Sequence, residues 1–188
     1  MREIALHLLD IAENSVSAGG RNIRMDVLEN LQDDLLNVSV TDDGRGMDEE
    51  TAKRVLDPFY TTRTTRKVGL GIPLLKLAAE SSGGGLSLET ESGKGTRIEA
   101  TFRHSHIDRM PLGDVGMTML TLLVSYPHVN WTFHYEVNGK DGNRQFLLDD
   151  KEIKSALGDV PLTEPDVLKF LRGMIEEGIA SVTPETVA

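Results

Sequence analysis

The stretch LLNVSVTDDGRGM, residues 35–47, joins an alternating strand pattern to an abrupt turn that contains glycine. Leu36, Val38 and Val40 alternate with polar residues, which predicts a strand with one buried face. The aspartates and glycines that follow favour a turn, and the simplest interpretation of them is an ordinary loop. The functional interpretation is that Asp42 holds a carboxylate at a strand end, where it can accept a hydrogen bond from a ligand amine.

The composition restricts the classes of function. The 188 residues are 39% hydrophobic and 27% charged, which is typical of a globular protein with one domain or one domain plus a small addition. The net charge of −10 argues against binding to nucleic acid or an anionic membrane, because both need cations. No cysteine is present, which excludes disulfides and thiolate metal sites. Without a signal peptide or an apolar run of membrane-spanning length, we expect a cytoplasmic protein.

Hydrophobic periodicity on both sides of the opening stretch predicts alternating helices and strands. Helices are predicted over residues 2–18, 49–56, 71–81, 113–125, 150–157 and 164–179, strands over 22–29 and 35–42, and hairpins over 86–102 and 131–150. The pattern of residue types along the chain changes near residues 103–111. We therefore predict a first domain at 1–104 and an accessory α+β region, a hairpin plus helices, at 105–188.

Asp10 and Asn14, in the segment DIAENSVSAG (10–19), stand four residues apart and share one face of a predicted helix. Taken alone, the pair fits a solvated helix face that also holds Glu13. The functional interpretation is an amide oxygen that binds a metal beside a carboxylate that activates water.

The segment RKVGLGIPLLKL (66–77) places two glycines and Pro73 at the mouth of a predicted helix, after two cations. These residues suit an ordinary helix entrance. They also suit an anion site, because N–H groups at a helix N-terminus attract anions and Gly69 and Gly71 carry no side chain to block a phosphate. The segment fits neither a Walker P-loop, which needs lysine followed by serine or threonine, nor a dinucleotide fingerprint, which needs a preceding strand.

Five motifs in this order over residues 1–103 resemble those of the GHKL ATPase superfamily, the ATP-binding domains of gyrase, heat-shock chaperones, histidine kinases and MutL-type proteins. DIAENSVSAG resembles the asparagine box, DDGRGM the adenine-binding box, DPFYTT (57–62) the segment that opens the ATP lid, GLGIPLL the second glycine box and GKGT the last. The resemblance implies a Bergerat-type α/β (α+β) sandwich, with a mixed, mostly antiparallel sheet and helices on one face, plus a small C-terminal α+β extension. It implies ATP and Mg²⁺ as cofactors.

The resemblance also implies roles for individual residues. Asn14 is placed at the magnesium ligand, Asp42 at the acceptor for the adenine amine, and Asp10 where MutL-like ATPases carry a catalytic glutamate. Gly44 and Gly46 would let the backbone close against a flat ring. Lys67 replaces the first glycine of the kinase box, so we expect it to stiffen the lid hinge. The expected ATP-binding residues are Asn14, Asp42, Gly44, Gly46, Met47, Phe59, Thr61, Thr62, Arg63, Arg66, Lys67, Gly69, Leu70, Gly71 and Thr96.

We expect a regulatory Mg-ATP-binding protein that phosphorylates or switches a separate protein partner. Because the ATP-binding motifs begin at residue 1, we expect no helical hairpin before them to carry a phosphoacceptor. HIDRMPL (106–112) shares a spacing with the kinase histidine box, but no acidic residue follows His106, and a linker is the simpler interpretation. The alternatives are a MutL-like ATPase that uses Asp10 and a nucleotide-gated adaptor of the anti-sigma type.

The segment 111–188 resembles the tail of small stand-alone bacterial proteins of this superfamily, some of them anti-sigma regulatory factors. PLGD (111–114) and DDKEIKSALGDVPL (149–162) carry this resemblance. The acidic, helical character of the tail indicates a surface for a partner or for a homodimer. The simpler interpretation is that the tail only covers an edge of the ATP-binding domain.

Overall fold

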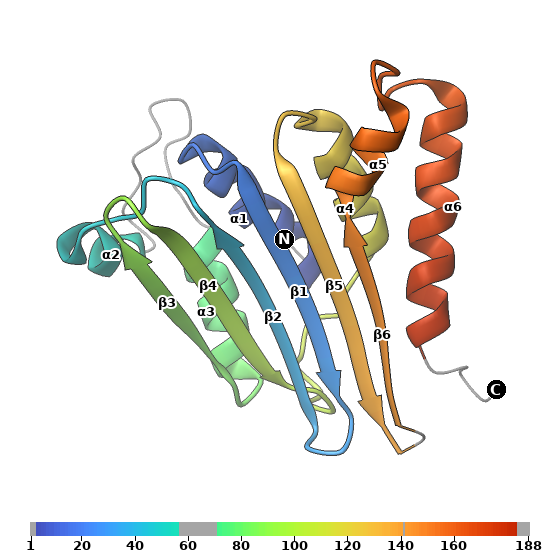
Figure 1. The fold of residues 1–188 in the computed structure, drawn as a ribbon. Helices are drawn as coiled ribbons and strands as arrows, with labels where there is room; N and C mark the ends of the chain where they lie inside the picture. The colour runs from blue at the N-terminus through green and yellow to red at the C-terminus, as the bar shows by residue number, and fades with distance from the viewer. Residues whose placement is uncertain (1–2, 57–70, 141, 184–188) are drawn as a thin grey trace.

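The computed structural model describes residues 3–56, 71–140 and 142–183, which form a six-stranded sheet with helices packed on it (Figure 1). The strand order is β3-β4-β2-β1-β5-β6. Neighbouring strands run antiparallel except β1 and β5, which run parallel. This confirms the predicted mixed, mostly antiparallel sheet. The strands are β1 (Asn22–Asn30), β2 (Leu35–Asp42), β3 (Gly85–Glu91), β4 (Gly95–Arg103), β5 (Asn130–Gly139) and β6 (Gly142–Asp149).

The longer helices lie on one face of this sheet (Figure 1). They are α1 (Ile4–Ser17), α3 (Gly71–Ser81), α4 (Val115–Ser125) and α6 (Pro165–Val182), and the shorter helices are α2 (Glu49–Val55) and α5 (Asp150–Leu157). As predicted, Asp48 caps α2 by accepting the Thr51 N–H at 2.7 Å, and Pro165 stands in the first turn of α6. No helix in the described residues has the length and apolar character needed to cross a bilayer.

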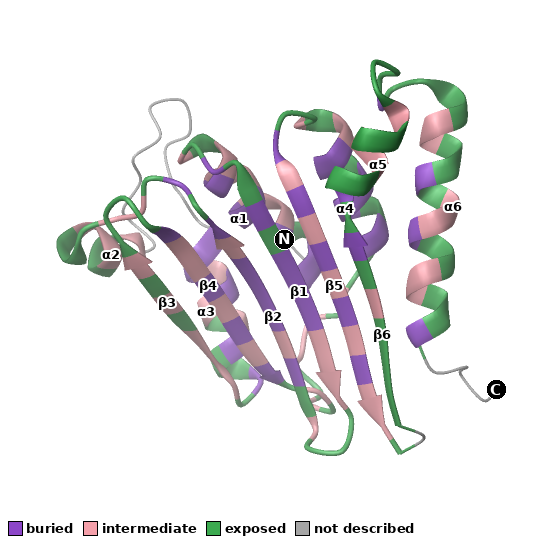
Figure 2. Ribbon diagram, viewed as in Figure 1, coloured by how far each residue is buried: buried purple, intermediate pink, exposed green. Residues whose placement is uncertain are grey.

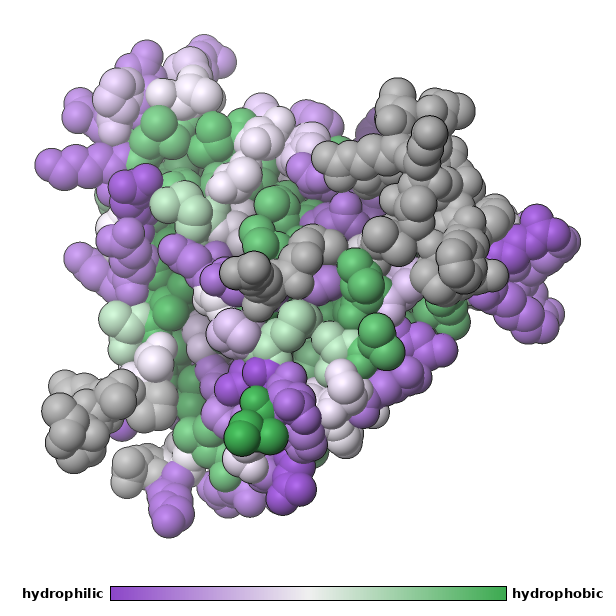
Figure 3. All heavy atoms as spheres, turned by 180° about the vertical axis from the view of Figure 1, so that it is seen from behind, coloured by the Kyte–Doolittle hydropathy of each residue, from purple (hydrophilic) through white to green (hydrophobic). Residues whose placement is uncertain are grey.

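The strands alternate between a face buried under the helices and an open face, as Figure 2 shows by colour. On β1, Ile23, Met25 and Val27 are fully buried in the core. The residues between them face the other way, where Arg24 Nε donates to Asp26 Oδ1 at 2.8 Å. On the helix side, apolar residues lie at the surface between polar ones (Figure 3). The core therefore lies in one layer, between the sheet and the helices.

Residues 105–188 extend the same sheet and the same core. After β4 the chain forms α4, which packs against α1, and then β5, which pairs with every residue of β1. Trp131, the only tryptophan of the chain, is fully buried on β5 opposite Ile23 of β1. The accessory region is thus a hairpin plus helices that is joined to residues 1–104 through one continuous sheet.

Asp34, in the turn between β1 and β2, holds the linker that follows β4. Its Oδ1 accepts the Ser105 N–H at 2.8 Å, and its Oδ2 accepts the Ser105 hydroxyl at 2.7 Å and Arg103 Nε at 2.9 Å. These hydrogen bonds, above all that of the Ser105 hydroxyl, lower the pKa of the Asp34 carboxyl to about 2. His106 lies in this linker and not in a helix, which agrees with the simpler interpretation of HIDRMPL.

Because β5 completes the sheet beside β1, we expect residues 1–104 and 105–188 to unfold in one transition. In a urea titration, Trp131 fluorescence should change at the same midpoint as far-UV circular dichroism. Met25→Ala, in β1, should lower both midpoints together, because truncating a buried side chain costs about 2–5 kcal/mol. A dichroism transition that moved while the Trp131 transition stayed in place would indicate two independent domains.

Candidate functional site

The centre of the candidate site is Asp42, where the end of β2 faces the C-terminal half of α1. Its side chain is oriented by two donors: Ser15 Oγ donates to Oδ2 at 2.5 Å and the Gly44 N–H donates to Oδ1 at 2.9 Å. Asp42 is only 8% exposed. Since a carboxylate offers about four acceptor positions, these two hydrogen bonds fix its orientation and leave capacity for a ligand donor.

Thr96 lies beside Asp42, because the two residues are paired in the register of β4 and β2. Its Oγ1 is 3.0 Å from that of Thr90 on β3, and the Thr90 hydroxyl also donates to the Gly95 carbonyl oxygen at 3.1 Å. Thr90 Oγ1 accepts the Met47 N–H at 2.9 Å. The loop after β2 is thereby attached to the β3–β4 hairpin, which brings Met47 and Thr96 to the same end of the sheet.

Gly44 and Gly46 each lie where an added side chain would collide with the protein itself. The expected approach of a flat ring to these two glycines stays a prediction. A Cβ on Gly46, whose φ is +61°, would overlap the Glu91 carbonyl oxygen. A Cβ on Gly44 would lie 2.9 Å from Asp42 Oδ1 and 3.0 Å from the Ala18 carbonyl oxygen. These glycines therefore let the loop pack against the protein's own atoms.

Gly71, the first residue of α3, packs directly on α1. A Cβ at this position would overlap Asp10 Oδ2, so the missing side chain lets α3 pack against α1. The expected contact of Gly71 with a phosphate stays a prediction. One turn earlier on α1, buried His7 donates from Nδ1 to the Gly71 carbonyl oxygen at 3.2 Å, since a carbonyl can only accept. Burial lowers the pKa of His7 below its ordinary value, so the ring is neutral at pH 7.

The described residues among those predicted gather at one end of the sheet. Asp10 and Asn14 lie half-buried on α1, and the remaining ones lie on β2, on the loop after it, on α3 and on β4. Their roles toward a ligand stay predictions. The predicted residues that lie outside the described part of the chain are Phe59, Thr61, Thr62, Arg63, Arg66, Lys67, Gly69 and Leu70.

Ser15, His7 and Thr90 belong to the site but were not among the predicted residues. Ser15 falls on the stripe of α1 that periodicity assigns to the core, and the structure buries it there with His7. A polar residue at a buried position is a usable signal, because it needs a hydrogen-bond partner. The sequence does not say where that partner is, since Asp42 and Gly71 are distant along the chain.

Comparison with known families assigns the first part of this chain to a class of ATP-binding proteins. Residues 1–106 match the family model described as histidine kinase-, DNA gyrase B- and HSP90-like ATPase. The chain belongs to this ATPase family, which implies that it binds ATP.

Several curated proteins are similar to the first part of the chain. The non-motile and phage-resistance protein of Caulobacter vibrioides is 31% identical over 117 residues, which cover 57% of this chain and 14% of that protein. Sporulation kinase E of Bacillus subtilis is 35% identical over 101 residues, 54% of this chain and 13% of that protein. The sensor histidine kinase AruS of Pseudomonas aeruginosa is 28% identical over 160 residues, 80% of this chain and 16% of that protein. The chain spans less than a fifth of the length of each relative.

Among solved structures, the N-terminal domain of a DNA repair protein is similar to almost the whole chain. The alignment covers 98% of this chain and 58% of that one, with a TM-score of 0.55 and 13% sequence identity. At this identity the likeness concerns the fold alone. It includes the accessory region, because the aligned part extends past residues 1–104.

Gly71→Ala should destabilise the protein, because the added methyl group must displace the Asp10 carboxylate. Overpacking of this kind costs about 1–3 kcal/mol, which urea denaturation followed by circular dichroism can measure. The matched control is Gly85→Ala, since a Cβ on Gly85 meets nothing within 4 Å among the described residues. Equal stability of the two variants would show that the contact between Asp10 and Gly71 is not tight in solution.

Proposed function

We propose that the chain binds Mg-ATP at the Asp42 site and acts as a kinase-like or nucleotide-switched regulatory module on a separate protein. The observation that carries the nucleotide assignment is the buried Asp42 carboxylate, held in one orientation by Ser15 and Gly44. An exocyclic amine such as that of adenine is a donor that fits its remaining acceptor capacity. Thr96, paired with Asp42, adds a hydroxyl at the same place.

We propose that the phosphates lie toward α1 and the beginning of α3. Asn14 would offer its amide oxygen to Mg²⁺, which usually takes one or two protein ligands and completes its shell with water and substrate phosphates. The described residues contain no cluster of three or more histidine or acidic side chains that could hold a metal. The ion would therefore arrive with the nucleotide, which supplies the phosphoryl group for transfer.

The positions of the histidines support a phosphoacceptor on a separate protein. All five lie in the described residues, and His7 alone is part of a helix, where it is buried and donates to Gly71. His106 lies in the linker, where its Nδ1 accepts the Asp108 N–H at 3.2 Å. Similarity to sporulation kinase E and to the sensor histidine kinase AruS supports kinase-type chemistry.

ATP hydrolysis by the chain itself is a second candidate function, and the position of Asp10 favours it. The Asp10 carboxylate lies against the first residue of α3 and on the same side of α1 as Asn14. From there it would act as a general base toward a water that attacks the terminal phosphate. Aspartate is one methylene shorter than the glutamate of MutL-like ATPases, so it must reach farther.

Asp42→Ala should weaken ATP binding by about 1.5–3 kcal/mol, the worth of a hydrogen bond to a charged group, or about 10–150-fold. Isothermal titration calorimetry with Mg²⁺ measures this effect. Asp108→Ala is the matched control, because Asp108 is an exposed carboxylate in the linker. Wild-type protein that bound neither ATP nor ADP would contradict the assignment.

Phosphate release by the pure protein separates the two functions. For a module that acts on a partner, we expect ATP binding with little steady-state release, and Asp10→Asn should leave that low rate unchanged. The measurement is a coupled phosphate assay with excess Mg-ATP. Sustained release that Asp10→Asn abolishes, with ATP binding retained, would instead establish the ATPase.

A further inference from the structure

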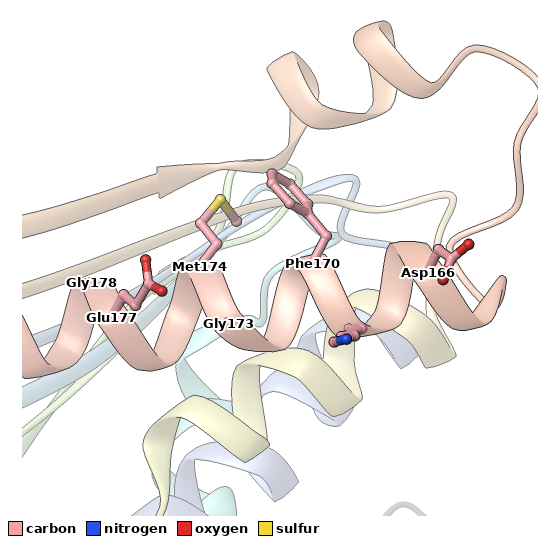
Figure 4. Close-up of a pocket in the computed structure, with 7 residues that line it drawn as sticks. Asp166, Phe170, Gly173, Met174, Glu177 and Gly178 are labelled. Carbon is pink, nitrogen blue, oxygen red and sulfur yellow. The ribbon is translucent and has the colours of Figure 1, made fainter.

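Helix α6 carries a half-open groove on the side of the molecule away from the Asp42 site. Phe170 is 61% exposed in this groove, whereas Leu171 and Ile175, on the neighbouring side of the helix, are buried in the core. Phe170 and Met174 project from α6 in the same direction (Figure 4). The groove has a volume of about 680 Å³ and is lined by Asp166, Lys169, Phe170, Gly173, Met174, Glu177 and Gly178.

The middle of the groove is formed by Gly173, a glycine that no contact with the described residues requires. A Cβ on Gly173 would meet nothing within 4 Å among the described residues, and glycine within a helix is less stable than alanine. Gly178 differs, because a Cβ there would overlap the Phe146 ring on β6. The space over Gly173 suits a second surface that approaches the helix backbone closely.

The charges on either side of Gly173 are complementary to those of an identical helix. Lys169 lies four residues before Gly173 and Glu177 lies four residues after it. Neither side chain has an ion-pair partner within residues 3–56, 71–140 and 142–183. In a twofold-symmetric contact, if one residue of the first copy contacts a second residue of the other copy, the reverse contact also forms. Two antiparallel α6 helices that cross at Gly173 would therefore place each Lys169 opposite Glu177 of the second copy.

We propose that this groove is the interface of a homodimer, in which two α6 helices pack antiparallel about Gly173. Phe170 and Met174 would supply the apolar contact on both sides of the crossing. The spacing of opposite charges about one glycine favours a second copy over an unrelated partner, because it is self-complementary. The proposal goes beyond the nucleotide function and does not depend on it.

The first test is a charge exchange, measured by sedimentation velocity of the full chain over a concentration series. Wild-type protein should approach twice the monomer mass of 20.7 kDa. Lys169→Glu and Glu177→Lys should each raise the dimer dissociation constant at least about tenfold, because like charges across an interface repel. The double variant should recover the wild-type constant, and Glu176→Lys, on α6 outside the groove, should match wild type. A monomeric wild type, or a double variant no tighter than the single ones, would overturn the proposal.

The second test uses the open space over Gly173. Gly173→Leu should abolish the dimer by filling the crossing point, while leaving the thermal midpoint of the monomer equal or higher, because leucine is the better helix former. Circular dichroism melts at concentrations where wild type is monomeric measure the midpoint. A Gly173→Leu protein that stayed folded and still formed the dimer would contradict an interface centred on this glycine.

Discussion

The packing of α1 against the middle of the sheet is the constraint on which the described site depends. Ile11 is fully buried under the helix layer, and the 3.6-residue repeat then sets the direction of every other side chain on the helix. Ser15, about one turn later, meets Asp42 at the end of β2, and His7, about one turn earlier, meets the Gly71 carbonyl at the beginning of α3. One helix thus holds two segments that are distant in sequence, and a shift of α1 along its axis would loosen both.

The secondary structure could be predicted from local chemistry, and the arrangement of its elements could not. Alternation of apolar residues marks the strands other than β6, and Asp48 and Pro165 mark helix beginnings, because these signals act within a few residues. The parallel pairing of β5 with β1 depends on which buried faces meet after a crossover through α4, which no local pattern encodes. For the site, motif resemblance located Asp42, whereas Ser15 became visible only when the fold brought its partner within hydrogen-bond distance.

The glycines show the same limit of prediction from sequence more clearly. A sequence shows that a glycine is present but not which atom requires the missing side chain. At Gly46 that atom is the Glu91 carbonyl oxygen, and at Gly71 it is a carboxylate oxygen of Asp10. Gly173 is the opposite case, because its surroundings are empty within the described chain. Gly46 and Gly71 let the loop after β2 and helix α3 pack against the rest of the protein, whereas Gly173 faces away from it.

The candidate site around Asp42 and the α6 groove lie toward opposite ends of one row of helices. α1 packs against both α3 and α4, and α4 packs against α6, so the row is continuous from Gly71 to the groove. Continuity of packing does not by itself couple two sites, because coupling requires that each binding event favour the same one of two arrangements. If such arrangements exist here, linkage makes the effect reciprocal: the factor by which ATP strengthens the dimer equals the factor by which the dimer strengthens ATP binding. A rigid row would leave both factors at one, and the two sites would then act as independent properties of the same chain.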